Sequence, residues 1–255
     1  HEDSVRSVLC LRDGITVITS SDDTTIRIWD LPSRTTQQVL TGNESKVRKL
    51  ALAPDESWFA SAGKDGTLRI WDLPAGKERL SRSEHGPWPG SNVGLMGVVI
   101  RPDAKVLATV ALDQTVRIWD TTSFEVEKTL GPFGRDTGTV AYSHDGTYLL
   151  FDLDAGPVHV MSADGQTLKR RLIGHQNWVY SIACAHEKDV AATGSEDWSV
   201  RVWDLVTGVE LATLGGHEFT VGSLAFSLDD RLLISGSGDE TVRVWDVSAL
   251  THPDD

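Results

Sequence analysis

Short runs of alternating apolar and polar residues recur along the chain, and polar turns separate them. Near the C-terminus, VGSLAFS at 221–227, LLISGS at 232–237 and TVRVWDV at 241–247 are joined by LDDR and GDE. Runs of this length and period predict short β-strands in an antiparallel meander. A fourth run follows the third elsewhere in the chain, at 35–41, 76–82 and 208–214.

One pattern, which ends in Trp-Asp, is written five times. It occurs as SSDDTTIRIWD (20–30), AGKDGTLRIWD (62–72), VALDQTVRIWD (110–120), GSEDWSVRVWD (194–204) and GSGDETVRVWD (236–246). The tryptophans stand at 29, 71, 119, 203 and 245, so their spacings are 42, 48, 84 and 42 residues. The spacing of 84 is twice 42 and predicts a degenerate copy centred on Met161. The spacing of 48 predicts an insertion, which fits the Gly-, Pro- and Ser-rich stretch 83–93.

A fixed period of this length is typical of repeat architectures. We predict one domain over 1–255 with six repeats, at about 1–42, 43–84, 85–132, 133–174, 175–216 and 217–255. Four short strands in each repeat predict an all-β fold of four-stranded sheets arranged radially, each covered on both faces by its neighbours. The last repeat lacks an apolar fourth run, so its sheet should lack the outer strand.

Composition narrows the classes of partner. Of the 255 residues, 40% are hydrophobic and 24% are charged, which is the composition of an ordinary globular domain. Its net charge of −13 argues against binding to nucleic acid or to an anionic membrane surface, since both favour clustered Lys and Arg. Cys10 and Cys184 stand at matching repeat positions, where the last repeat has Phe226. We therefore expect two buried free thiols.

These Trp-Asp endings, together with Gly-His at 174–175 and 216–217, resemble the WD40-repeat β-propeller family over residues 1 to about 246. The resemblance implies a hydrogen-bonded set in each repeat, here called the relay: an opening His, a Ser or Thr on the second strand, a turn Asp and a third-strand Trp. Carried over by position, the relays are His1, Thr19, Asp23 and Trp29; His175, Thr193, Asp197 and Trp203; and His217, Ser235, Asp239 and Trp245.

The other three repeats depart from this pattern. The second has Asn43 in place of His, beside Ser61, Asp65 and Trp71. The third keeps Thr109, Asp113 and Trp119, but we expect the insertion to displace His85. The fourth has Phe151, Ala155 and Met161, so its relay should be lost.

Ser, His and Asp within one relay are also the residues of a nucleophilic triad. The set recurs in several repeats, however, whereas active sites are few in a protein, and each copy ends on a Trp donor. We therefore predict a structural role, with no catalytic residue, cofactor or metal. A hydrolase remains the alternative from another class, and a nucleic-acid-binding propeller is a weaker one.

The resemblance also implies where partners bind: beside the first apolar residue of strand one and before the turn Asp. Three large aromatic residues fall at or next to these positions in the fifth repeat, Trp178, Tyr180 and Trp198, with Glu196 between them in the turn. Four cations form what we call the basic sector of the first two repeats: Arg6, Lys46, Arg48 and Lys64. Further candidates are Met96, Phe219 and, in the insertion, Trp88.

Two readings compete for the aromatic residues, because they either bind a partner or pack on each other as ordinary rim residues. If they bind, the partner is a protein or peptide with an apolar anchor and acidic residues, or another domain of the same polypeptide. We expect a cytoplasmic interaction platform attached to a larger signalling or sensor protein, with no nucleic-acid or membrane partner.

Closure of the ring is open at this stage. The first repeat begins at its opening turn, and the last has three predicted strands. Six blades could close with a short last sheet, a strand preceding His1 could complete it, or a seventh blade could come from further sequence or from another chain.

Overall fold

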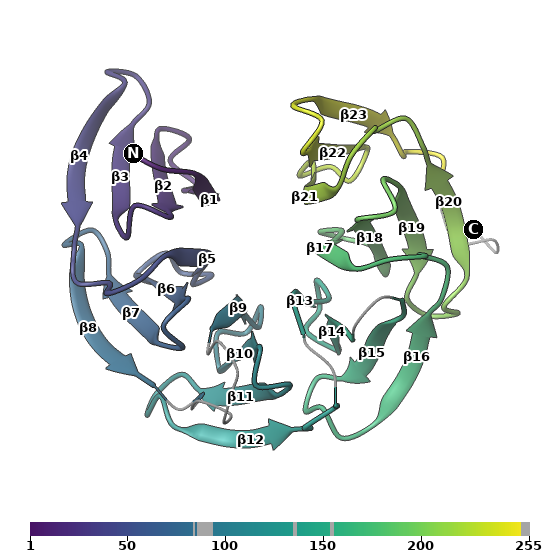
Figure 1. Ribbon diagram of the computed structural model, residues 1–255, viewed down its shortest axis with the longest axis horizontal. Coiled ribbons are helices and arrows are strands. Elements are labelled where there is room, and N and C mark those ends of the chain that lie inside the picture. The colour runs from purple at the N-terminus through teal and green to yellow at the C-terminus, as the bar shows by residue number, and fades with distance from the viewer. Residues whose placement is uncertain (84, 86–93, 135–136, 154–155, 251–255) are drawn as a thin grey trace. The chain divides into compact units, whose positions relative to one another are not determined.

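The computed structural model describes residues 1–83, 85, 94–134, 137–153 and 156–250, which form strands and turns. The strands assemble in chain order into antiparallel sheets, here called blades one to six (Figure 1). Blades one to five have four strands, and blade six has three within the described residues. The predicted all-β fold class, with a shortened last sheet, is confirmed. None of the described segments forms a helix with the length and hydrophobicity needed to cross a lipid bilayer.

The chain divides into two compact units, 1–136 and 137–255. The first unit holds blades one to three, whose first strands pack against one another in sequence, β1 on β5 and β5 on β9. Its strands are β1 Val5–Cys10, β2 Thr16–Ser21, β3 Ile26–Asp30, β4 Thr35–Leu40, β5 Val47–Leu52, β6 Trp58–Gly63, β7 Leu68–Asp72, β8 Lys77–Arg82, β9 Leu95–Ile100, β10 Val106–Ala111, β11 Val116–Asp120 and β12 Val126–Leu130.

The second unit holds blades four to six and repeats this packing, with β13 on β17 and β17 on β21. Its strands are β13 Val140–Tyr142, β14 Tyr148–Asp152, β15 Val158–Ser162, β16 Leu168–Leu172, β17 Val179–Cys184, β18 Val190–Ser195, β19 Val200–Asp204, β20 Glu210–Leu214, β21 Val221–Phe226, β22 Leu232–Ser237 and β23 Val242–Asp246.

Burial follows position within a blade. The second strands β6, β10 and β18 are buried at every residue. In blades two and five, neighbouring blades of the same unit cover both faces, so the sheet has no solvated side. The fourth strands, such as β8 and β12, alternate between exposed and partly buried residues. In blade six, β23 leaves Val242 and Val244 70% and 61% exposed. The apolar core of the first unit therefore centres on second- and third-strand residues such as Leu107 and Trp119, both fully buried.

One expectation about the core was wrong. Cys10, the last residue of β1, is exposed, because the residues of β1 are exposed or partly buried and none of them is buried in the core. Cys184 is partly buried and packs against the apolar cluster around Trp203. Its burial raises the pKa of the Cys184 thiol to about 12, so this thiol is unreactive at neutral pH. Both cysteines are free, as the sequence predicted.

Candidate functional site

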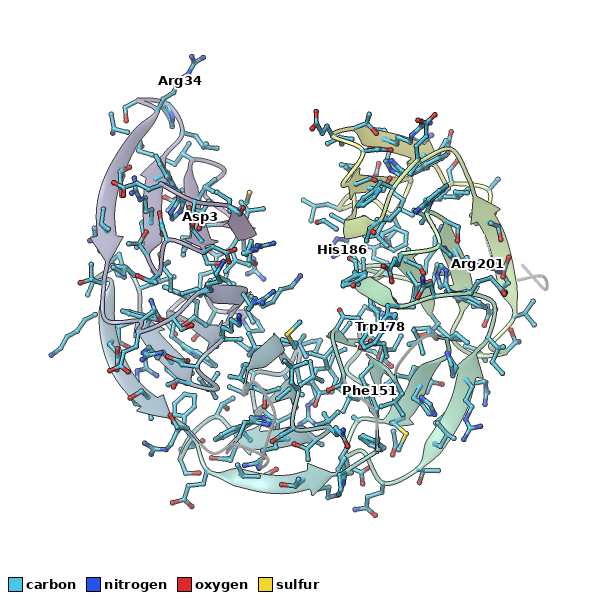
Figure 2. All side chains as sticks on the ribbon, in the orientation of Figure 1. Asp3, Arg34, Phe151, Trp178, His186 and Arg201 are labelled. Carbon is cyan, nitrogen blue, oxygen red and sulfur yellow. The ribbon has the colours of Figure 1, made fainter. Side chains whose placement is uncertain are left out.

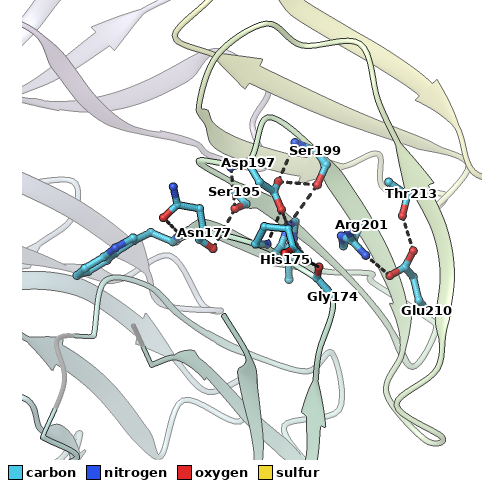
Figure 3. Close-up of polar contacts among 12 residues, drawn as sticks. Gly174, His175, Asn177, Ser195, Asp197, Ser199, Arg201, Glu210 and Thr213 are labelled. Carbon is cyan, nitrogen blue, oxygen red and sulfur yellow. Dashed lines mark hydrogen bonds and ion pairs between the residues drawn. The ribbon is translucent and has the colours of Figure 1, made fainter. Parts of the chain in front are cut away.

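The relay of blade five is complete, and Figure 3 shows two of its members, His175 and Asp197, with the neighbouring Ser199. The Trp203 indole N–H donates to Thr193 Oγ1 at 2.8 Å, and Thr193 Oγ1 lies 2.7 Å from His175 Nε2. His175 Nδ1 in turn lies 2.8 Å from Asp197 Oδ2. Because the carboxylate can only accept, Nδ1 carries the imidazole proton, and the threonine hydroxyl donates to Nε2. The bonds thus run in one direction, from the indole to the carboxylate.

The electrostatics of this relay favour a neutral histidine beside an ionised aspartate. Burial lowers the pKa of His175 and outweighs the opposing effect of Asp197. Burial alone would raise the pKa of Asp197, but hydrogen bonds from Ser199, Gln176 and His175 lower it to about 2. Thr193 is fully buried, so no substrate could reach its hydroxyl. These hydrogen bonds give the relay a structural role.

Blades one and six have the same bonds. In blade one, His1 lies 2.8 Å from Asp23 and 2.7 Å from Thr19, which accepts from Trp29 at 2.7 Å. In blade six, His217 lies 2.8 Å from Asp239 and 2.7 Å from the fully buried Ser235, which accepts from Trp245 at 2.9 Å. The structure therefore brings together all twelve relay residues named from the sequence in blades one, five and six.

Blade three corrects the sequence analysis. His85 is not displaced: it lies 2.8 Å from Asp113 and 2.7 Å from Thr109, which accepts from Trp119 at 2.8 Å. The extra residues fall after His85, in 86–93, so the insertion leaves the relay intact. That stretch, including Trp88, lies outside the described residues.

Blades two and four have incomplete relays. In blade two, Trp71 donates to Ser61 at 2.9 Å, but Asn43 donates to the Thr24 carbonyl oxygen instead of reaching Ser61. In blade four, Phe151 is fully buried and stacks on His159 at a centroid distance of 6.0 Å. An apolar packing contact thus occupies the place of the hydroxyl, while Ala155 lies outside the described residues.

The candidate binding residues lie at a repeated backbone feature that the sequence did not reveal. A bulge or register irregularity opens strand one of five blades, and the bulged residues are Arg6, Arg48, Met96, Tyr180 and Gly222. Beside each bulge lies the turn between the second and third strands, and we call this end of a blade its turn end. A β-bulge redirects the side chain it carries and is common beside functional sites.

The turn end of blade five presents the three aromatic side chains. Trp178 immediately precedes β17 (Figure 2), and its carbonyl accepts from Glu196 N at 2.9 Å. Tyr180 is 44% exposed and Trp198 is 51% exposed. Burial raises the pKa of Tyr180, and the charges of Glu196 and Asp152 add to this effect. Backbone bonds thus fix the three rings on one turn end, next to two carboxylates.

Among the described residues, no ring contact joins Trp178, Tyr180 and Trp198 to one another. The described rings of Trp178 and Trp198 therefore do not stack on each other, and the alternative that stays open is packing of each ring on its own turn as an ordinary rim residue. Phe219, in blade six, lies against its own turn, since a Cβ on Gly238 would stand 2.5 Å from its ring. Met96, in blade three, is partly buried.

Trp198 has an unusual backbone conformation. The residue after the turn Asp has positive φ in five blades: Thr24, Gly66, Gln114, Trp198 and Glu240. At φ 69°, Trp198 is a bulky residue in the left-handed region, which glycine tolerates best. This conformation costs a non-glycine residue about 1–2 kcal/mol, and it belongs to the turn of the repeat, since Thr24, Gln114 and Glu240 share it. What distinguishes blade five is the large aromatic side chain at this position.

The basic sector divides into two halves. Arg6 Nε donates to Asp22 Oδ1 at 2.9 Å and its Nη2 donates to Oδ2, while Lys46 Nζ donates to Oδ2 at 2.8 Å. These cations hold the pKa of Asp22 well below its usual range, although burial opposes the shift. Arg6 and Lys46 are therefore engaged within the protein. Arg48 and Lys64 have no such carboxylate among the described residues.

Lys49, next to Arg48 on β5, is a partly buried amine that the sequence analysis missed. The equivalent positions hold Ser7, Gly97, Ser181 and Ser223, all small residues. Desolvation lowers the pKa of Lys49. The repeat alignment could have identified it as the exception among small residues.

Because the folded-state pKa of Lys49 is lowered, the protonated amine costs stability at neutral pH, and this cost disappears as the pH rises toward 10.5. We expect Lys49→Met, which keeps the chain length without the charge, to raise the thermal midpoint at pH 7 by about 2–4 °C. The gain should vanish near pH 10.5. Lys77→Met, at an exposed position, is the control, and an equal gain in both variants would refute this account.

One group of possible metal ligands was not predicted from the sequence. His144 and Asp145 lie in the turn between β13 and β14, and Asp189 lies in the turn between β17 and β18. His144 Nδ1 lies 3.8 Å from Asp189 Oδ1, and Asp145 already accepts from Ser143 and Thr147. An ion pair between His144 and Asp189 when the imidazole is protonated explains this arrangement. We assign no metal to it.

Comparison with known proteins gives two matches. The family model "WD domain, G-beta repeat" matches residues 1–30, 34–72, 83–120, 166–204 and 208–246. The unmatched stretch 121–165 contains Phe151 and Met161, where the relay is absent. The chain is also 44% identical over 45 residues to the pre-mRNA-splicing factor PRP46 of Yarrowia lipolytica (strain CLIB 122 / E 150). That match covers 18% of this chain and 10% of the splicing factor.

Proposed function

The chain belongs to the WD40 repeat family, and from that premise we propose that it is a non-catalytic interaction platform whose blade five binds a peptide or protein segment. The observation that carries the proposal is Trp198, an exposed tryptophan kept in a left-handed backbone conformation. Trp and Tyr are enriched where binding energy concentrates, and exposed hydrophobic groups held on rigid turns bind with little loss of entropy.

The chemistry of the turn end defines the partner. Trp178, Tyr180 and Trp198 offer apolar area to an aliphatic or aromatic anchor. The carboxylates of Glu196 and Asp152 lie close enough to affect the Tyr180 hydroxyl, so this end favours a neutral or basic residue beside the anchor. This differs from the acidic partner expected from the sequence, because that expectation included the basic sector.

Selection from a displayed peptide library on the purified chain tests the proposal. We expect related sequences with an apolar anchor, whose affinity falls at least about tenfold with Tyr180→Ala. Leu228→Ala is the matched control, because Leu228 is 84% exposed in the turn between β21 and β22, away from the turn ends. Equal loss in both variants, or no enrichment of any peptide, would remove the support for a binding role.

Trp198→Gly should separate stability from binding. Glycine adopts φ near 69° without strain, as Gly66 does in blade two at φ 80°. We therefore expect the free energy of unfolding to rise by about 1 kcal/mol while peptide affinity falls. Chemical denaturation and a binding titration measure the two effects. A variant that is both less stable and fully competent to bind would contradict the assignment.

The rival hydrolase assignment makes a different prediction. Ser235 is fully buried and already accepts from Trp245 while bonded to His217. We expect a serine-reactive fluorophosphonate to leave the folded chain unlabelled. Stoichiometric labelling that is lost in Ser235→Ala would favour the hydrolase.

We extend the proposal to its setting: a recognition or regulatory propeller of a larger signalling or sensor protein in the cytoplasm. Fractionation of cells that produce the tagged full-length protein tests this extension. Recovery in the cytoplasmic fraction is expected. Co-purification with nuclear splicing complexes, in line with the name of the yeast relative, would overturn it.

A further inference from the structure

Blades one and two share a backbone at their turn ends but differ in charge. In blade one, Asp22 N donates to the Ser4 carbonyl at 2.9 Å, and in blade two, Lys64 N donates to the Lys46 carbonyl at 2.8 Å. The strand-one bulge carries Arg6 in one blade and Arg48 in the other. The pair Arg48 and Lys64 therefore occupies the place of the pair Arg6 and Asp22.

Blade one shows which group this geometry holds. The Asp22 carboxylate accepts two bonds from the Arg6 guanidinium and one from Lys46. Its side chain is 1% exposed, while each cation is 40% exposed. A bidentate Arg–carboxylate pair with a second cation is among the stronger polar arrangements available to a protein.

In blade two, the internal carboxylate is missing. Lys64 stands in its place, so two cations are neighbours where blade one has an ion pair. Arg48 Nε is buried and has no partner among the described residues, and Lys64 forms no ion pair with any of them. The Nε atoms of Arg27 and Arg243 are also buried without an acceptor, so what distinguishes blade two is the second cation, Lys64, at the place of the Asp22 carboxylate.

In the next blade, the backbone of Gly94 lies beside Lys64, which is partly buried. The residue that corresponds to Lys46 in blade three is Gly94, whose backbone carbonyl accepts from Leu112 in the same pattern. A Cβ on Gly94 would lie 3.2 Å from the Lys64 carbonyl oxygen and 3.7 Å from Lys64 Cγ. A glycine here therefore keeps space beside the lysine that a side chain would fill.

We propose that Arg48 and Lys64 form a receptor for the carboxylate of an Asp or Glu side chain of a peptide or protein that binds the first unit. The incoming carboxylate takes the place that Asp22 has in blade one: its oxygens accept from the Arg48 guanidinium and from Lys64 Nζ. This inference rests on the proposed peptide-binding function, but it concerns the first unit and uses none of the blade-five aromatic residues.

The test compares wild type, Lys64→Asp and the control Lys77→Asp. Lys77 is exposed, and its side chain has no hydrogen bond or ion pair within the part of the chain that the structure describes. Its substitution by Asp makes the same change in net charge. Two readouts are used: the Nε–H resonance of Arg48 during titration, and the thermal midpoint. The probes are an acetylated peptide with two adjacent Asp residues, its Asn counterpart, and inorganic phosphate.

The Asp peptide should shift the Arg48 resonance saturably in wild type and in Lys77→Asp, with an affinity at least about tenfold above that of the Asn peptide. Lys64→Asp should abolish this response and raise the thermal midpoint by about 2–4 °C, because the new Asp pairs with Arg48 as Asp22 pairs with Arg6. Binding of phosphate without the Asp peptide, undiminished binding to Lys64→Asp, or no response in wild type would each overturn the inference.

A second titration of the same variants, with a library-selected peptide that carries the apolar anchor, separates this inference from the proposed function. The indole N–H signals of Trp178 and Trp198 report on blade five, which Lys64→Asp leaves unchanged. Loss of the Arg48 response with normal indole responses refutes the carboxylate receptor alone. The reverse outcome refutes the blade-five assignment and leaves the receptor in place.

Discussion

Thr193→Val is expected to lower the free energy of unfolding by about 2–4 kcal/mol, since two buried polar groups lose their partner. Trp203 Nε1–H and His175 Nε2 both bond to the Thr193 hydroxyl, at 2.8 and 2.7 Å. Valine matches the shape of threonine, so lost packing contributes little. Chemical denaturation of the purified chain measures the effect.

Thr213→Val is the matched control for this change, because Thr213 is exposed and bonds only to Glu210. It should cost less than about 0.5 kcal/mol. Thr193→Ser, which keeps the hydroxyl, should recover part of the loss. Equal stabilities for Thr193→Val and Thr213→Val would show that the relay does not contribute to folding as described.

Asp22→Asn is expected to cost about 1–3 kcal/mol at neutral pH, because it leaves Arg6 and Lys46 without their shared carboxylate. This loss is smaller than the value of about 3–5 kcal/mol that is typical of fully buried pairs, since both cations are 40% exposed. Asparagine keeps the shape, so the difference isolates the charge. Thermal and chemical unfolding at pH 7 measure it.

The same variant has a defined pH dependence. The pKa of Asp22 is lowered in the folded protein, so its contribution is complete above the ordinary value of 3.8 and is lost as the pH falls below it. The stability difference between wild type and Asp22→Asn should therefore shrink in acid. Glu127→Gln, which removes a carboxylate at an exposed position with no side-chain hydrogen bond or ion pair to any described residue, is the matched control. A constant penalty for Asp22→Asn from pH 7 to pH 2 would contradict the ion-pair assignment.

Most of the fold could be predicted from the repeat period, because each repeat of about 42 residues supplies its own strands and turns. The resemblance to the WD40 family, carried over at Trp29, Trp203 and Trp245, implied three relays, and Met161 with Phe151 marked blade four as divergent. His85 was misplaced for a simple reason: a spacing gives the length of an insertion but not the side of a residue on which it falls.

The candidate site was only partly predictable. Sequence placed Trp178, Tyr180 and Trp198 near one another, but the strain at Trp198 depends on a backbone angle that its residue type does not favour. The pairing of Arg6 and Lys46 with Asp22 brings together three segments from two blades, so no local pattern reveals it. The basic sector therefore looked like four equivalent cations until their partners were known.

The most direct test of the central claim is a ¹H–¹⁵N spectrum of the tryptophan indoles during titration with a library-selected peptide. Trp178 and Trp198 should shift progressively with peptide, because they form the contact surface. The relay indoles of Trp29, Trp119, Trp203 and Trp245 should stay in place, since each is bonded to a hydroxyl within its blade. Shifts confined to relay indoles, or an unchanged spectrum at saturating peptide, would contradict blade five as the binding surface.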